Sequence, residues 1–85
     1  MERRERSYRG ISVRAAMMYL EGLGGERVDY QTVAGDGWEA SLSAEQVEIG
    51  RSLELTETTV VFEGDPETLE SVVEQFSQKA IRAGG

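Results

Sequence analysis

Two segments of the chain carry apolar residues at the spacing of an α-helix. Residues 11–25, "ISVRAAMMYLEGLGG", are predicted as the first helix. Its apolar stripe consists of Val13, Ala16, Met17, Leu20 and Leu23. Ser12 can cap the N-terminus by accepting a hydrogen bond from a backbone N–H one turn further on. Gly24 or Gly25 supplies the left-handed residue that ends such a helix.

The second helix is predicted over residues 64–85, "GDPETLESVVEQFSQKAIRAGG". Asp65 is in the N-cap position and Pro66 in the first helical position, where proline is favoured. The buried stripe is expected to contain Leu69, Val72, Val73, Phe76, Ala80 and Ala83. Gly84 then stands where a helix C-cap is expected.

Alternation of apolar and polar residues predicts five strands between and around these helices. A short first strand is expected around Ser7 to Ile11. A hairpin follows, with residues 28–33 and 38–42 joined by the turn "AGDG". Residues 47–49 form a short strand, and after a turn at 50–52 a long strand runs over 53–62.

The long strand changes the parity of its apolar residues. Leu53 and Leu55 fall on one face, whereas Val60 and Phe62 fall on the other. Because a shift of one residue turns every side chain over, a bulge or a strong bend is expected between Thr56 and Thr59.

This order of elements predicts an α+β fold of strand–helix–four strands–helix. Two amphipathic helices covering one face of a mostly antiparallel sheet make a two-layer sandwich. Residues 1–7, "MERRERS", are expected to be a disordered basic N-terminus, and residues 8–85 a single domain.

The charge is unevenly distributed. Sixteen acidic residues face nine basic ones, for a net charge of −7. Between Ala15 and Gln78 there are two basic and fourteen acidic residues, so this stretch carries 2 − 14 = −12. Such a surface repels phosphate, and we expect no nucleic-acid partner. A carboxylate-rich surface with a single lysine is typical of halophilic archaea, in which it keeps proteins soluble.

Composition also limits the chemistry. The chain has no Cys and no His, which removes thiolate and imidazole nucleophiles, bases and metal ligands. Its longest unbroken apolar run, residues 15–20, is too short to span a bilayer, and no signal-type segment follows the N-terminus. We therefore expect a cytoplasmic, non-enzymatic protein with no cofactor, no metal and no membrane partner.

An interaction surface is the remaining functional candidate. The sheet face away from the helices is expected to be polar and acidic, and aromatic residues can supply one contact at an interface. The candidate residues are Asp29, Gln31, Trp38, Glu39, Ser41, Glu48 and Glu54. An unidentified protein partner or a homodimer would use this surface.

The chain ends in Gly84-Gly85, which admits a second function. Ubiquitin-like modifiers and sulfur carriers use a terminal Gly-Gly carboxylate, carried on an extended tail. Here the preceding residues have a helical period, so termination of the helix is favoured over conjugation chemistry. A modifier or sulfur carrier acting through this carboxylate is the alternative.

Three stretches, "RGISVRAAMMYLEGLGGERV", "GDGWEASL" and "VVFEGDPETLESVVEQFSQKAIRAGG", resemble the MoaD-related C-terminal domain family, which includes small stand-alone haloarchaeal proteins. The resemblance covers nearly the whole chain after about Tyr8. It implies a fold described as TBP-like, and a link to sulfur-carrier and molybdopterin cofactor assembly. It carries no catalytic residues over to this chain.

Overall fold

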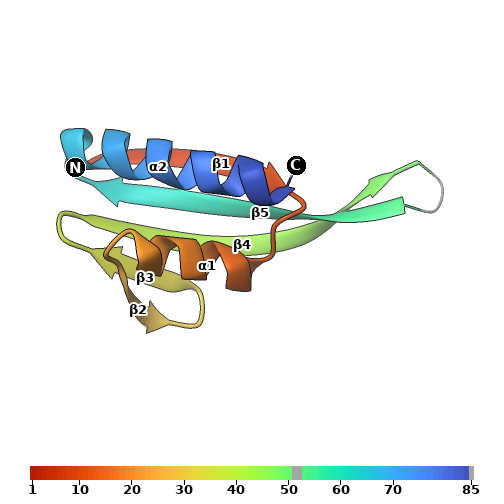
Figure 1. Cartoon of the computed structure of the whole chain (residues 1–85), viewed down its shortest axis with the longest axis horizontal. Coiled ribbons are helices and arrows are strands. Elements are labelled where there is room, and N and C mark those ends of the chain that lie inside the picture. Colours follow the sequence, from red (N-terminus) through yellow and green to blue (C-terminus); the bar gives the residue numbers. More distant parts are fainter. Residues whose placement is uncertain (51–52, 85) are drawn as a thin grey trace.

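A computed structural model shows a single five-stranded sheet with both helices on one face (Figure 1). The structure describes residues 1–50 and 53–84. Along the chain the elements are β1 (Glu2–Arg9), α1 (Val13–Gly22), β2 (Glu26–Asp29), β3 (Thr32–Gly35), β4 (Trp38–Ile49), β5 (Leu53–Gly64) and α2 (Pro66–Gly84). The strand order is β1-β5-β4-β3-β2, and every neighbouring pair is antiparallel. The predicted α+β sandwich, with helices on one face, is confirmed.

The helix ends follow the predicted capping chemistry. The Ser12 hydroxyl accepts a hydrogen bond from the Ala15 N–H at 3.1 Å and starts α1. Gly24, with a φ of 99°, ends it and donates its N–H to the Glu21 carbonyl. At the start of α2 the Asp65 carboxylate accepts from the Thr68 N–H at 3.4 Å. Local sequence therefore determines where both helices begin.

The core lies between the helices and the covered face of the sheet. α2 packs over β1 and β5, and α1 packs against β2, β3 and β4. The rings of Tyr8 and Phe62 both meet Phe76 edge-on, at centroid distances of 5.1 and 5.8 Å. The buried apolar residues are Ile11, Ala16, Met17, Leu20, Val33, Trp38, Ala40, Leu42, Val60, Phe62, Leu69, Val72, Val73, Phe76 and Ala80. One contiguous cluster thus joins both helices to the sheet.

The long strands differ from the prediction, because β4 and β5 pair continuously. Their register runs from Trp38 opposite Gly64 to Ile49 opposite Leu53. Of the bulge or strong bend expected between Thr56 and Thr59, the bulge is wrong, because the register has no shift there. The parity of apolar residues changes because the far part of this hairpin extends beyond the helices, where the covered face has nothing to pack against (Figure 1). We call this part, residues 45–49 and 53–57, the arm.

The predicted hairpin is divided differently. The segment expected as one strand, 28–33, contains a tight turn between β2 and β3. The Asp29 carboxylate accepts a hydrogen bond from the Gln31 N–H at 2.8 Å, a side-chain contact that favours a turn. Val28 and Tyr30 are consequently exposed, and Val33 is the buried residue. The segments expected at 38–42 and 47–49 merge into β4.

The N-terminus also differs from the expectation of a disordered segment over residues 1–7. Strand β1 begins at Glu2 and pairs with β5 over its whole length, from Glu2 opposite Gly64 to Arg9 opposite Glu57. The many charged residues of this segment gave no apolar alternation from which a strand could be predicted. They are compatible with a strand because β1 lies at the edge of the sheet and most of its side chains reach solvent. Tyr8, which packs against Phe76, is its link to the core.

The buried hydroxyl of Thr58 generates a prediction about stability. It is fully buried and donates to the Ile11 carbonyl at 2.6 Å, tying β5 to the segment before α1. The substitution Thr58→Val leaves that carbonyl without its partner, and we expect the free energy of unfolding to fall by about 1–3 kcal/mol.

Chemical denaturation measures this loss. Thr59→Val is the matched control, because the neighbouring side chain is only half-buried and its hydroxyl bonds to Ser7 on the exposed side. A loss for Thr58→Val no larger than that of the control would contradict the role assigned to the Thr58–Ile11 bond.

Candidate functional site

The candidate site is the face of the sheet that the helices leave uncovered, here called the open face. The register assigns alternate residues of each strand to it, beginning with Glu39 on β4 and Glu63 on β5. Its carboxylates are Glu5, Glu26, Asp29, Glu39, Glu45, Glu57 and Glu63, and its arginines are Arg3 and Arg9. The open face is therefore strongly acidic.

Three of the residues predicted for the interaction surface lie on this face. Glu39 is exposed, Ser41 is half-buried, and Asp29 stands at the turn between β2 and β3. Gln31 is exposed in that turn, and its carbonyl accepts from the Leu42 N–H at 2.8 Å. Asp29, Glu39 and Ser41 therefore share the open face, whereas Gln31 stands in the turn opposite Leu42, which belongs to the helix-covered side.

Trp38 belongs to the core instead. It is only 7% exposed and lies on the helix-covered side, in line with Ala40 and Leu42. Its indole packs over Gly35, where an added Cβ would overlap the ring. The aromatic ring is thus held by its own hairpin and does not lie on the open face.

Glu48 and Glu54 are likewise not on the open face. They oppose each other near the end of the arm, and both have the parity of the helix-covered side. The arm carries them beyond the helices, so both are exposed. The predicted surface is therefore divided between two sides of the molecule.

Like charges stand directly opposite each other along the β4–β5 ladder. Glu39 opposes Glu63 and Glu45 opposes Glu57, both on the open face. Cross-strand neighbours of like charge are destabilising. The Arg9 guanidinium reaches Glu57 at 3.1 Å and offsets one of these contacts. The carboxylates at Glu39 and Glu63 lie at the opposite end of the sheet from this pair.

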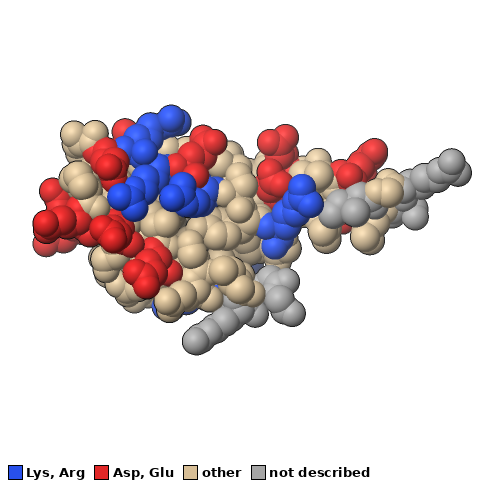
Figure 2. All heavy atoms as spheres, turned by 90° about the horizontal axis from the view of Figure 1, so that it is seen from above, with Lys and Arg blue, Asp and Glu red and all other residues tan. Residues whose placement is uncertain are grey.

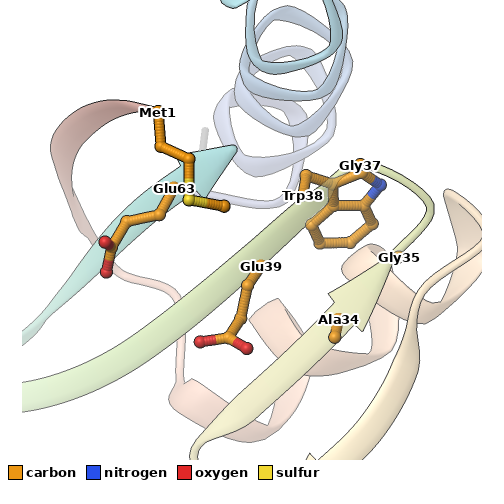
Figure 3. Close-up of a pocket in the computed structure, with 7 residues that line it drawn as sticks. All are labelled: Met1, Ala34, Gly35, Gly37, Trp38, Glu39 and Glu63. Carbon is orange, nitrogen blue, oxygen red and sulfur yellow. The ribbon is translucent and has the colours of Figure 1, made fainter. Parts of the chain in front are cut away.

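A hollow of about 450 Å³ lies beside the Glu39–Glu63 pair (Figure 3). Its lining consists of Met1, Ala34, Gly35, Gly37, Trp38, Glu39 and Glu63. Both carboxylates are exposed to solvent. Within residues 1–50 and 53–84, no group of three metal-ligating side chains is close enough to hold an ion. The two carboxylates beside this hollow can therefore attract a positively charged group.

The arm adds an apolar patch to the open face. Val47 opposes Leu55, and both are half-buried, while Leu53 is 56% exposed at the end of β5. Figure 2 shows the arm projecting from the body of the protein, with acidic side chains along it. Apolar contacts bordered by charge are the usual composition of a protein interface.

Sequence reasoning missed five carboxylates of the open face, Glu5, Glu26, Glu45, Glu57 and Glu63, of which the last three lie on β4 and β5. Their signal was present in the alternation, since Glu39, Ser41 and Glu45 have the same parity on β4. The expected break between residues 42 and 47 interrupted that count. Pairing β4 and β5 as uninterrupted strands would have brought these residues together.

Comparison with known proteins gives the family of this chain. A family model described as archaeal MoaD-like protein matches residues 4–85. No curated protein matches the sequence. Neither α1 nor α2 has the length and apolar character of a bilayer-spanning helix, in the part of the chain that the structure describes.

The Glu39–Glu63 pair generates a prediction about stability and salt. Glu39→Lys places a cation opposite Glu63, and we expect the free energy of unfolding to rise by about 0.5–1 kcal/mol at low salt. Molar salt should remove most of this gain, because charges at the surface are then screened within about 3 Å.

Denaturation at low and molar salt measures both effects. Glu26→Lys, an exposed position on β2 that opposes the uncharged Ala34, makes the same change in net charge without an acidic strand partner. Equal gains in the two variants would show that net charge matters and the cross-strand pair does not.

Proposed function

The chain belongs to the archaeal MoaD-like family, and we propose that it is a small non-enzymatic module whose open face binds a basic surface of a partner protein. The family relationship points to proteins of sulfur transfer, and we place the partner in sulfur-carrier or molybdopterin cofactor assembly. The observation that carries the proposal is the excess of carboxylates on a sheet face that the helices leave free.

Electrostatics supports a basic protein surface as the ligand. The opposed pairs Glu39–Glu63 and Glu45–Glu57 repel within the free protein. Positive side chains of a partner placed between the paired carboxylates would be attracted to both of them and would also relieve the repulsion between them. Each such contact would therefore favour the complex in two ways. Complementary charge also accelerates encounter and discourages partners of the wrong sign. The apolar patch at Val47, Leu53 and Leu55 would provide the desolvated part of the same interface.

The side-chain inventory supports a binding role over catalysis. Acyl or phosphoryl transfer at a serine needs an adjacent base, and this chain has no histidine to supply one. Its single lysine, Lys79, is exposed on α2. The TBP-like fold name implied by the resemblance stays a prediction, and a fold name gives no reason to propose DNA binding.

The alternative function is a modifier or sulfur carrier acting through the Gly84-Gly85 carboxylate. Gly85 lies outside the described residues. α2 continues through Gly84, so this glycine is the last residue of the helix and does not follow it as the expected C-cap. An extended tail before the terminal residue is not what this segment forms. Helix termination is therefore favoured, and a thiocarboxylate at Gly85, detected by mass spectrometry of the protein from its host, would establish the alternative.

The binding proposal is tested with purified proteins of the same host. We expect the chain to bind the molybdopterin-synthase sulfur carrier or its adenylating enzyme, measured by calorimetry. The double variant Glu39→Gln/Glu63→Gln should weaken this binding by about tenfold, which corresponds to 1.4 kcal/mol. Added salt should weaken it as well, because the attraction is between charges.

The matched control is Glu70→Gln/Glu74→Gln, which removes two charges from the exposed side of α2. Equal weakening in both double variants would assign the effect to net charge and contradict the open face as the site. Binding to neither protein would contradict the placement in sulfur-carrier assembly.

A second prediction concerns nucleic acid. We expect no binding to duplex DNA at moderate salt in the range of about 1–100 μM that non-specific binders reach. Fluorescence anisotropy with labelled duplex measures it. The unchanged chain is compared with Arg3→Gln/Arg6→Gln, because β1 carries four of the nine basic residues of the chain. Micromolar binding that these substitutions abolish would contradict the prediction.

A further inference from the structure

Strand β1 is a free edge of the sheet. Its eight residues all pair with β5 in continuous register, and its other side has no strand neighbour in the described chain. Long regular edges of this kind readily pair with another strand. With four arginines and two glutamates, β1 carries 4 − 2 = +2 in a chain of −7. The edge and the open face therefore differ in the charge they offer a partner.

Alternation of the ladder shows which backbone groups of β1 are free. The Gly10 N–H donates to the Thr56 carbonyl at 3.0 Å, so the even-numbered residues of β1 are bonded to β5. The N–H and C=O groups of Arg3, Glu5, Ser7 and Arg9 consequently point outward. The Arg6 guanidinium donates to the outward carbonyl of Glu5 at 2.8 Å, where the N–H of an added strand would bind.

Symmetry restricts how two copies of β1 can pair. In an antiparallel pair related by a two-fold axis, opposed residues must lie on the same face of the sheet. An odd-numbered residue therefore opposes an odd-numbered one, and an even an even. Each allowed register is identified by the residue that lies on the two-fold axis. The sequence then shows which charged residues of the two copies oppose each other in that register.

The register with Ser7 on the axis is electrostatically complementary. Glu5 then opposes Arg9 of the second copy on the open face, and this contact occurs twice. Arg6 opposes Tyr8 of the second copy on the helix side, where a guanidinium can lie over the aromatic ring. The outward groups of Glu5, Ser7 and Arg9 would form about six backbone hydrogen bonds between the copies.

The other registers with comparable overlap bring like charges together. With Glu5 on the axis, the two copies of Glu5 face each other and Arg4 opposes Arg6. With Arg6 on the axis, the two copies of Arg6 face each other and Arg3 opposes Arg9. With Arg4 on the axis, Arg3 opposes Glu5 and Glu2 opposes Arg6, each twice, while the two copies of Arg4 face each other. Like charges directly opposite are destabilising, and the Ser7 register is the one of these four that opposes none, so we take it as the register to test against the Arg4 register.

The helix layer beside this edge offers a further contact. The Tyr8 hydroxyl and the Ser77 hydroxyl are 2.7 Å apart, which places this side of α2 over β1. Ile81 follows Ser77 by four residues, on the same side of the helix, and is 69% exposed. A second copy paired through β1 would bring its own α2 towards this exposed side chain.

We propose that the protein forms a two-fold dimer by antiparallel pairing of β1 strands centred on Ser7, which joins two five-stranded sheets into one. The inference goes beyond the proposed function, since it concerns a different surface and needs no other protein. It rests on the outward-pointing backbone groups of Glu5, Ser7 and Arg9 and on the complementarity of Glu5 with Arg9. The Glu5 carbonyl would exchange its hydrogen bond from Arg6 for one from the second copy.

Charge reversal tests the register. Glu5→Arg and Arg9→Glu each put like charges opposite each other in two places, and each variant alone should raise the dissociation constant of the dimer by about tenfold or more. Mixed together, the two variants regain both opposite-charge pairs and should associate nearly as well as the unchanged protein. Sedimentation and light scattering at moderate salt measure the masses.

Glu26→Arg is the control for Glu5→Arg. It makes the same glutamate-to-arginine change on β2, at the other edge of the sheet, and should leave the dimer intact. Circular dichroism and thermal unfolding establish that each variant is folded, which matters for Arg9→Glu since Arg9 also contacts Glu57 in its own chain. A monomeric unchanged protein at about 100 μM, or folded variants that fail to pair when mixed, would overturn the proposal.

Cross-linking provides a second measurement that does not depend on charge. The chain has no Cys, so Ser7→Cys introduces one thiol, which meets its counterpart only across the axis. Opposed residues of a hydrogen-bonded pair have Cα atoms about 5.5 Å apart, within the range that a disulfide spans. Mild oxidation should give a covalent dimer much faster than for Ser43→Cys, an exposed position on β4. Equal rates would overturn the Ser7 register.

Discussion

The continuous register between β4 and β5 determines where nearly every other residue lies. Because side chains alternate along paired strands, fixing Trp38 opposite Gly64 also fixes the face of each residue along both strands. Ala40, Leu42, Val60 and Phe62 then meet the helices, and the carboxylates of the same strands face solvent. A slip of one residue would bury Glu39 and Glu63 and expose the core, which no compensation elsewhere could offset.

The end of this ladder is held by a close approach of backbone. Gly64 has a φ of 153°, and an added Cβ would overlap the Gly37 carbonyl oxygen. That same carbonyl accepts the Asp65 N–H at 3.1 Å, immediately before α2. The turn before β4, the last residue of β5 and the N-cap of α2 therefore share one small region. The register of the sheet and the start of the helix that covers it are fixed together.

Helices were predictable because their signals are local. Ser12, Gly24, Asp65 and Pro66 act within one turn of their own positions, and their chemistry does not depend on the rest of the fold. Strand ends depend instead on distant residues. Leu55 faces away from the helices because of its register with Val47 on β4, and no residue near Leu55 in the sequence records that pairing. The edge strand β1 was hidden for a related reason, since only Tyr8 among its residues packs against the core.

The candidate site was predictable to the extent that alternation was followed. Glu39 and Ser41 were placed on the open face by their parity on β4, whereas Trp38 shares the parity of Ala40 and Leu42 and belongs to the core by the same rule. The aromatic ring of Trp38 suggested an interface residue, but the alternation of apolar residues along β4 predicts its burial correctly. The opposed glutamates needed the strand pairing itself, which a single sequence does not provide.

The fold separates charge into two surfaces on which salt acts differently. β1 carries +2 and the rest of the chain 5 − 14 = −9, so the basic residues gather at one sheet edge while acidic residues dominate the open face. The proposed binding of a basic partner to that face would rest on charge attraction and would weaken as ions screen it. The proposed pairing of two β1 strands would bring together two chains of −7 each. Ions would relieve their overall repulsion and screen the Glu5–Arg9 contacts, and would leave the backbone hydrogen bonds between the copies largely unchanged. If both proposals hold, high salt would weaken binding at the open face more than it weakens association between copies.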